Sequence, residues 1–215
     1  DCHRRIDAVN PALNAVVAED RAAALAEAKR PLLIAGGSRW KPEDVEALKA
    51  FAHAWSLPVA VSFRRQDLYS CDDENFIGDL GIGCAAYLAD YAKSADLVLM
   101  LGGRLSENPS QSYSLLAIPA PEQFLIHVHP DPLELGHVYS APLPVNATPG
   151  TFLAAMAAIE PAGPDRSETV AGLSRQWEQR ATPQAVDSGF DPGAVMAYLN
   201  ETLPADAIVC NGAGN

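Results

Sequence analysis

The sequence predicts an α/β fold in which helices cover both faces of a doubly wound, mainly parallel sheet. Three observations support this prediction: short apolar runs of strand length, helix-length segments with apolar residues at helical spacing, and a regular alternation of the two. Strands that are apolar throughout are typical of parallel sheets buried on both faces. Alternating strands and helices of these lengths indicate right-handed crossovers and therefore a Rossmann-like architecture.

Helix and strand signals follow one another at short intervals along the chain. Pro31 ends the first helix directly after Lys29 and Arg30, cations that suit a helix C-terminus. Thr148 is an expected N-cap, with Pro149 at the first helical position. The expected strands lie at residues 32–35, 58–61, 96–101 and 124–128, with a weak edge strand at 143–145. The expected helices lie at residues 20–29, 42–55, 84–93 and 148–159.

Changes in composition divide the chain into four parts. Residues 160–189 are rich in Pro, Gly, Ser and charge, which is typical of a linker, and one short helix is expected there at residues 173–180. After it, the pattern predicts a helix at 192–203 and a buried strand at 207–210. The expected parts are an N-terminal segment and helix (1–30), a dinucleotide-binding-like domain (31–160), a linker (161–190) and the beginning of a further domain (191–215).

Composition and charge exclude several classes of protein. Hydrophobic residues make up 48% of the chain and no apolar run approaches the roughly 20 residues that span a bilayer, so a membrane protein is not expected. A net charge of -12 repels phosphate backbones, which argues against a nucleic-acid partner. The four cysteines are far apart and form no C-x-x-C pair, which favours a reducing cytoplasm over a disulfide scaffold or zinc ribbon.

The turn Gly36-Gly37-Ser38 is the first candidate binding site. It lies between an expected parallel strand and a helix, where free backbone N–H groups and the positive helix end point to one place. This arrangement suits a diphosphate. The alternative is that the tight turn requires glycine for its backbone conformation alone.

A second glycine motif, Gly81-x-Gly83-x-x-Ala86, matches the dinucleotide fingerprint G-x-G-x-x-A. It follows the apolar residues 76–77 and opens a helix. The next strand ends in Gly102-Gly103-Arg104, so the carboxylate that usually binds a ribose 2′-hydroxyl is absent there. Arg104 is a candidate for binding a phosphate instead, and its alternative is a solvated side chain in a surface loop.

His127, His129 and Asp131 alternate along one expected strand and its end, so they point to one face and could begin a metal site. No further His, Cys or Asp cluster supplies the remaining ligands at a telling spacing, so we assign no metal ligand. The sequence contains no G-x-S-x-G, H-E-x-x-H or G-x-x-x-x-G-K-[ST] motif. We therefore assign no catalytic residue within the chain.

Three stretches together resemble the central domain of acetolactate synthase-like thiamine diphosphate enzymes, the family that includes pyruvate oxidase and benzoylformate decarboxylase. Their order and spacing both agree, and the resemblance covers roughly residues 20–160. The tail 191–215 resembles the entry into the diphosphate-binding catalytic domain of that family. The stretches are PLLIAGGS (31–38), GDLGIGCAAYLADYAKSADLVLMLGGRLSE (78–107) and FLIHVHPDPLELG (124–136).

The resemblance implies that a longer parent enzyme acts on a 2-oxo acid, as a transferase or lyase that forms or cleaves a carbon–carbon bond. In the family, thiamine diphosphate and Mg²⁺ are held between a pyrimidine domain and a diphosphate domain of two subunits, in homodimers or homotetramers. The chain contains neither the pyrimidine domain nor most of the diphosphate domain of this pattern. We therefore expect it to be inactive alone.

The resemblance also implies a binding site in the central domain itself, which holds FAD or ADP in some members and nothing in others. Gly36, Gly37 and Ser38 would face a diphosphate, and His129 replaces an acid that tends to stand in acetolactate synthases. Three further sets complete the expectation. Gly81 and Gly83 would form the opposing loop, Gly103 and Arg104 the ribityl or ribose side, and Asn211, Gly212, Gly214 and Asn215 a loop bordering the thiamine diphosphate site.

Other functions remain open at this point. The chain could be a stand-alone module that binds ADP or a dinucleotide as a regulatory signal, without chemistry. It could also be an NADP-dependent oxidoreductase that uses the motif beginning at Gly81, although few residues remain for a second domain. Residues 5–16 (RIDAVNPALNAV) resemble the N-terminal helix and loop of amidase signature hydrolases, and we assign them no chemistry.

Overall fold

The computed structural model describes residues 21–184, 186–187, 189–204 and 206–210. The chain forms two compact units, one of residues 1–177 and one of residues 178–215, which are described separately. The amidase-like stretch 5–16 lies outside the described residues. Among the described residues, no helix combines the length and the apolarity needed to cross a bilayer.

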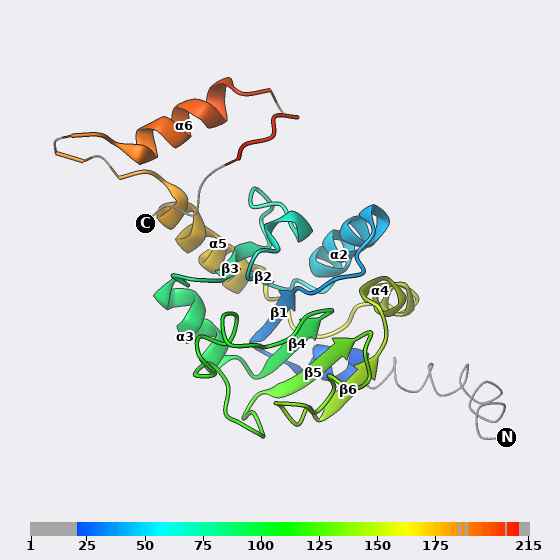
Figure 1. The fold of residues 1–215 in the computed structure, drawn as a ribbon. Coiled ribbons are helices and arrows are strands. Elements are labelled where there is room, and N and C mark those ends of the chain that lie inside the picture. The colour runs from blue at the N-terminus through cyan, green and yellow to red at the C-terminus, as the bar shows by residue number, and fades with distance from the viewer. Residues whose placement is uncertain (1–20, 185, 188, 205, 211–215) are drawn as a thin grey trace, which may run out of the picture. The chain divides into compact units, whose positions relative to one another are not determined.

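The first unit is built on a six-stranded sheet whose strands all run parallel (Figure 1). The strand order is β3-β2-β1-β4-β5-β6, so the chain runs outwards from β1 to β3 and then returns to β4 on the other side of β1. This order confirms the predicted doubly wound, Rossmann-like fold. The strands are β1 (Pro31–Ala35), β2 (Val59–Ser62), β3 (Phe76–Leu80), β4 (Leu97–Leu101), β5 (Phe124–His129) and β6 (Leu143–Asn146).

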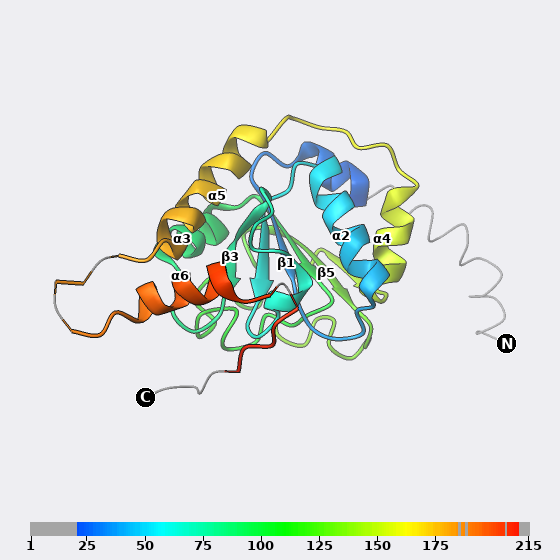
Figure 2. The same ribbon diagram turned by 90° about the horizontal axis from the view of Figure 1, so that it is seen from above.

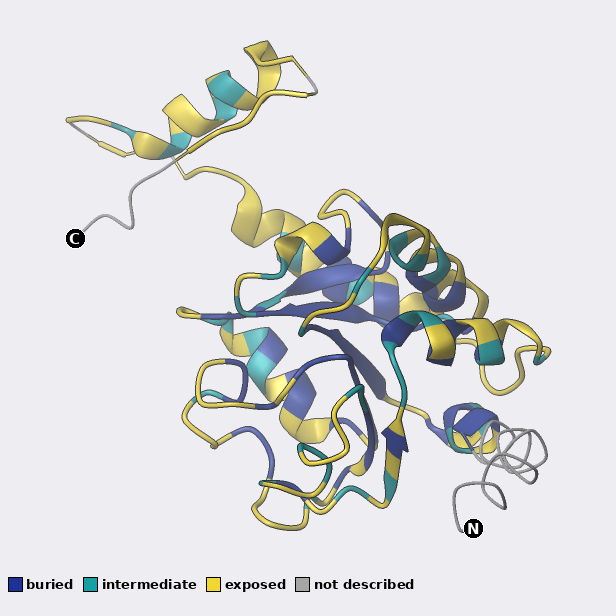
Figure 3. Ribbon diagram, turned by 45° about the vertical axis from the view of Figure 1, so that its right-hand side comes forward, coloured by how far each residue is buried: buried dark blue, intermediate teal, exposed yellow. Residues whose placement is uncertain are grey.

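Helices cover both faces of the sheet, as Figure 2 shows, with α2 and α4 on one side and α3 and α5 on the other. Alternate residues of β1 point to the two faces: Leu33 packs into the core with α2 and α4, and Ile34 into the core with α3. The central strands β1, β2 and β4 are accordingly buried along their whole length, whereas the edge strand β6 buries only Val145 (Figure 3). Residues 21–27 are helical, and the other helices of this unit are α2 (Pro42–Ala54), η1 (Gln66–Leu68), α3 (Ala86–Ser94), α4 (Pro149–Ala157) and the greater part of α5 (Ser167–Ala181).

The segment that composition marks as a linker contains a longer helix than the sequence predicts. Helix α5 begins at Ser167, where the Asp165 carboxylate accepts a hydrogen bond from the Ser167 amide at 2.9 Å. It buries Val170 and Leu173, and the Trp177 ring packs edge-on against Phe76 of β3 at 5.0 Å. A narrow apolar stripe on an otherwise polar helix explains why composition alone indicated a linker.

The second unit contains the end of α5 and, among its described residues, the helix α6 (Pro192–Thr202) in the predicted place. Asp191 caps it by accepting a hydrogen bond from the Ala194 amide at 3.0 Å. The prediction of a buried strand at 207–210 is wrong: these residues form no strand, and Ile208 is 90% exposed. The physical reason is that a strand needs a partner for its backbone groups, and no other strand of the described chain pairs with this segment.

Candidate functional site

A crevice of about 400 Å³ lies at the carboxyl ends of the central strands of the first unit. This is the place where the strand order reverses, between β1 and β4, and open α/β sheets bind their ligands at such switch points. Three loops line it. They contribute Gly37, Ser38 and Arg39 after β1, Gly103 and Arg104 after β4, and His129, Pro130, Asp131 and Glu134 from the end of β5 onwards.

The two glycine turns pack directly against each other beneath this crevice. Gly37 has φ 71° and Gly102 has φ 80°, conformations that side chains with a Cβ rarely adopt. A Cβ at Gly37 would collide with the carbonyl oxygen of Gly102, and one at Gly36 would lie 2.7 Å from the Cβ of Ser62. The glycines are therefore required by backbone packing. This supports the alternative that the turn needs glycine for its backbone conformation alone.

The same packing leaves backbone donors available in the β1 turn. The Gly36 amide donates to Leu101 O at 3.0 Å, which ties the turn to β4. The amides of Gly37 and Ser38, by contrast, make no hydrogen bond within the described chain. Two adjacent unpaired N–H groups at the rim of a crevice form a small anion-binding nest.

The N-terminus of α2 contributes less to anion binding than the sequence suggested. The Asp44 carboxylate accepts a hydrogen bond from the Lys41 amide at 3.0 Å, so a side chain of the helix itself already caps this end. Glu43 adds a second acid to the first turn. These charges offset the positive end of the helix, so anion binding at the crevice would depend on the loop amides and the arginines.

Charged side chains of both signs line the crevice. Arg104 pairs with Glu134, with 3.6 Å between Nη1 and Oε2. Arg39 is exposed and has φ 65°, a left-handed conformation at the tip of the β1 turn. His129 closes its own loop, because its Nδ1 accepts a hydrogen bond from the Asp131 amide at 3.1 Å.

His127 points to the same face as His129 but is buried, and its Nε2 lies 3.0 Å from the carbonyl oxygen of Gly103. Because a carbonyl can only accept, Nε2–H is the donor. Burial lowers the pKa of His127 and so favours the neutral form of its ring. Within the described parts of the chain, no group of three or more His, Cys, Asp or Glu side chains is arranged to hold a metal ion.

The structure brings together five of the predicted site residues and separates others. Gly81 and Gly83 follow the edge strand β3, two strands away from β1, and do not line the crevice. The fingerprint beginning at Gly81 therefore lies away from the switch point, which argues against its use in an NADP-dependent oxidoreductase. Gly37, Ser38, Gly103, Arg104 and His129 line the crevice, Gly36 lies beneath it, and Asn211, Gly212, Gly214 and Asn215 lie outside the described residues.

Sequence reasoning missed Arg39, Pro130 and Glu134 as crevice residues. Arg39 directly follows the glycine turn, so its position was a usable signal. Glu134 is thirty positions from Arg104 in the chain, and nothing local marks the two as partners.

A model of the family described as thiamine pyrophosphate enzyme, central domain, matches residues 18–156. The matched stretch contains all six strands and the crevice between their loops. The chain belongs to this family. The resemblance that the three sequence stretches indicated is thereby confirmed.

Curated relatives of this central domain are large subunits of acetolactate synthase. The protein from Corynebacterium glutamicum is 24% identical over 88% of the chain and 31% of its own length. The protein from Parasynechococcus marenigrum is 27% identical over 87% of the chain and 30% of its length, and that from Haemophilus influenzae 28% identical over 63% and 24%. The chain thus spans less than a third of the length of these relatives.

Proposed function

We propose that this central domain works within a thiamine diphosphate-dependent enzyme of the acetolactate synthase type, acting on a small 2-oxo acid in a reducing cytoplasm. The support is the family match together with relatives that are named acetolactate synthases. Thiamine diphosphate would supply the electron sink, and flanking domains with Mg²⁺ would hold it in a homodimer or homotetramer. The same relatives do not favour a stand-alone regulatory module.

The role of this chain would be to bind the diphosphate of FAD or ADP in the crevice. The observation that carries this proposal is the meeting of unpaired backbone amides and a cation at the switch point. The Gly37 and Ser38 amides suit phosphate oxygens on one side, and Arg104 suits them on the other. The volume of about 400 Å³ is within the usual range for small-molecule sites.

The ion pair between Arg104 and Glu134 opposes this binding. A diphosphate that draws Arg104 towards itself must weaken the 3.6 Å pair with Glu134 and leave that carboxylate near the new anion. Glu134 therefore opposes phosphate binding and Arg104 favours it. Neutral replacements of the two residues should change the affinity in opposite directions.

Calorimetric titration of the chain with ADP and, separately, with FAD tests the proposal. We expect saturable ADP binding that Arg104→Gln weakens roughly tenfold, since a charge-assisted hydrogen bond contributes about 1.5–3 kcal/mol. Glu134→Gln should strengthen it, and Arg175→Gln, an exposed change on α5, should leave it unchanged. FAD binding would identify a flavin site, whereas no binding of either ligand would refute a nucleotide role for the crevice.

A further inference from the structure

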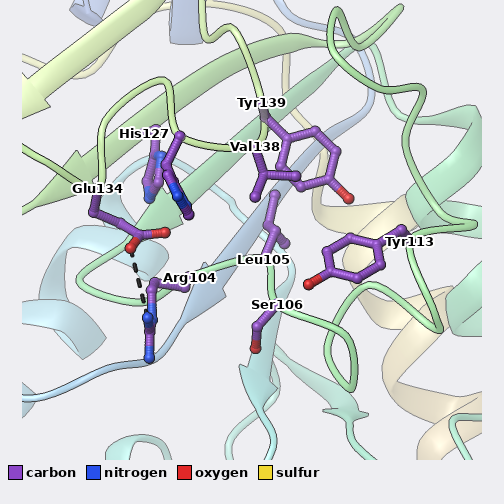
Figure 4. Close-up of a pocket in the computed structure, with 9 residues that line it drawn as sticks. Arg104, Leu105, Ser106, Tyr113, His127, Glu134, Val138 and Tyr139 are labelled. Atoms are coloured by element: carbon purple, nitrogen blue, oxygen red, sulfur yellow. Dashed lines mark ion pairs between the residues drawn. The ribbon is translucent and has the colours of Figure 1, made fainter.

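A second cavity of about 130 Å³ lies beside the crevice, between the loop after β4 and the loop after β5. Arg104 and Glu134 line both spaces, so their ion pair lies where the two meet. Figure 4 shows Arg104, Glu134 and His127 on one side of the cavity and the rings of Tyr113 and Tyr139 on the other. None of the family stretches noted in the sequence includes the two tyrosines.

Two polar groups of this ring pocket lack a hydrogen-bond partner in the described chain, and one of them, the Tyr139 hydroxyl, is a buried atom. Tyr139 is only 4% exposed, and its hydroxyl makes no hydrogen bond in the described chain. Burial raises the pKa of Tyr139, with a smaller opposing effect of the Ser110 hydroxyl, which itself donates to Ser106 O at 2.7 Å. His127 is 5% exposed; its Nε2–H donates to Gly103 O, and its Nδ1 has no hydrogen-bond partner within the described residues.

Unpartnered buried groups destabilise a fold unless they serve a ligand or ordered water. A buried donor or acceptor left unpaired loses its hydrogen bonds to water without replacement. The ring pocket contains such a hydroxyl, and the unpaired Nδ1 of His127 and the Glu134 carboxylate are acceptors that line the same pocket. The set can accept at least two hydrogen bonds from one bound molecule.

The loop that brings Tyr113 to this pocket is conformationally strained. Gln111, Ser112 and Tyr113 have φ of 51°, 55° and 59°, three successive non-glycine residues in the left-handed region. The Ser110 hydroxyl accepts a hydrogen bond from the Tyr113 amide at 2.9 Å, and the Gln111 amide group donates to Gly81 O at 3.1 Å. Strain of this kind concentrates at functional sites, where surrounding contacts maintain it.

We propose that the ring pocket binds a single six-membered nitrogen heterocycle that carries N–H donors. The size fits one ring, since a cavity of about 150 Å³ accommodates benzene. The rings of Tyr113 and Tyr139 and the side chains of Leu105 and Val138 provide flat and apolar contacts. The acceptors at His127 and Glu134 require N–H groups on the ligand.

Such a ring can be a free compound or the base of a pyrimidine nucleotide whose phosphates lie in the crevice. The proposal does not rest on binding of ADP or FAD in the crevice, because the ring pocket has acceptors of its own. Titration with free cytosine and with cytidine monophosphate separates the two sources. Equal affinities indicate the free ring, and tighter nucleotide binding indicates the base.

The test compares cytosine with unsubstituted pyrimidine, a ring of the same size without N–H groups, in calorimetric titrations of the chain. We expect saturable binding of cytosine and at least tenfold weaker binding of pyrimidine. Tyr139→Phe should weaken cytosine binding about fivefold, because it removes one hydrogen bond of roughly 1 kcal/mol. Tyr198→Phe, on the exposed surface of α6, is the matched control.

A stability measurement makes the same variant more informative. Because the Tyr139 hydroxyl is buried without a partner, Tyr139→Phe should leave the melting temperature unchanged or raise it, even though it weakens binding. No saturation with cytosine, affinities for cytosine and pyrimidine that are equal, or unchanged cytosine binding in Tyr139→Phe would overturn the proposal. Binding of cytidine monophosphate that Tyr139→Phe leaves unchanged, without binding of cytosine, would assign the ligand to the crevice and overturn it as well.

Discussion

Asp73 is the most extensively bonded acid of the first unit, and its side chain is only 4% exposed. Tyr69 donates to it at 2.9 Å, the Asn75 amide donates at 3.0 Å, and Lys49 lies at 3.1 Å. Nε2 of His53, on α2, lies 3.0 Å away. These bonds tie the loop before β3 to α2, so Asp73 acts on the stability of the fold rather than on the crevice.

The pKa of Asp73 makes this contribution measurable. Burial alone would raise that pKa, but the hydrogen bonds from His53, the Asn75 amide, Lys49 and Tyr69 together lower it to about 2. A carboxyl whose pKa is lower in the folded than in the unfolded chain stabilises the fold above its unfolded value. That stabilisation is lost as the pH falls from about 4 towards 2.

We therefore expect Asp73→Asn to lower the free energy of unfolding by roughly 2 kcal/mol at neutral pH, since each pKa unit corresponds to about 1.4 kcal/mol. The difference from the native chain should shrink as the pH falls from 4 to 2. Urea denaturation at several pH values measures this. The control is Asp72→Asn, at the neighbouring exposed residue, and it should have little effect on the free energy of unfolding. A deficit of the Asp73 variant that is independent of pH would contradict the argument.

Side chains of the crevice illustrate what single residues in a sequence can indicate. Gly37, Ser38 and Arg104 were predictable, because each lies within three residues of the end of an apolar run that predicts a strand. The roles of His127 and Glu134 were not predictable, since they depend on Gly103 and Arg104, which belong to another loop. Contacts between distant loops are set by tertiary packing, which no local pattern encodes.

At the scale of elements, the β1 and β4 turns act as one packed unit. The carbonyl of Gly102 occupies the place that a side chain at Gly37 would need. A bulky residue at Gly37 would therefore disturb the fold as well as any ligand, and loss of binding would not identify the cause. Arg104 is the better position for a binding test, because its side chain is exposed.

The comparison of Gly37→Ala with Gly83→Ala separates collision from backbone strain. Both glycines have positive φ, 71° and 79°, but no atom lies within 4 Å of a Cβ added at Gly83. We expect Gly83→Ala to cost about 1 kcal/mol, from conformation alone. Gly37→Ala should cost more than about 2 kcal/mol, because the backbone of Gly102 must also shift. If urea denaturation showed that both variants lose the same free energy of unfolding, the β1 and β4 turns would have to separate easily.

Arg166 joins the segment before α5 to the ends of two other helices. The side chain is buried and donates to Ala28 O at 3.1 Å, just after the helix at 21–27. It also donates to Trp55 O at 3.0 Å, at the C-cap of α2. A guanidinium in this position satisfies free carbonyls and complements the negative helix ends.

Replacing Arg166 by Met should destabilise the first unit by about 3 kcal/mol, because buried carbonyls lose their donors while the volume is largely kept. The midpoint of urea denaturation measures the effect. Arg175→Met, at an exposed arginine of α5, is the control and should have almost no effect. A loss below about 0.5 kcal/mol for the Arg166 variant would mean that water satisfies these carbonyls instead.

For the whole molecule, the sequence predicted the layers but not the strand order. Most strands are apolar runs and most helices have an apolar stripe, and these patterns are local. Strand β3, with the sequence FIGDL, has no such run and was not predicted. The position of β3 at an edge depends on which strands pair. The residues and spacing of the motif beginning at Gly81 therefore could not show that it lies away from the β1 turn. The exposed segment 207–210 has the composition of a strand, but composition does not supply a neighbour to pair with.

The two compact units should differ in local stability, because all residues of the two hydrophobic cores that the described chain forms belong to the first. Helix α6 has no buried residue, whereas the shorter helix α3 buries Leu88, Tyr91 and Ala92. An isolated helix of eleven residues is marginal in water, since its stability normally comes from packing. Hydrogen exchange should therefore be at least roughly a thousandfold faster in α6 than in α3, given a core stability of about 5 kcal/mol or more. Exchange measured by mass spectrometry on peptides of the two helices decides the point: similar protection of α6 and α3 would mean that α6 packs against an apolar surface in solution.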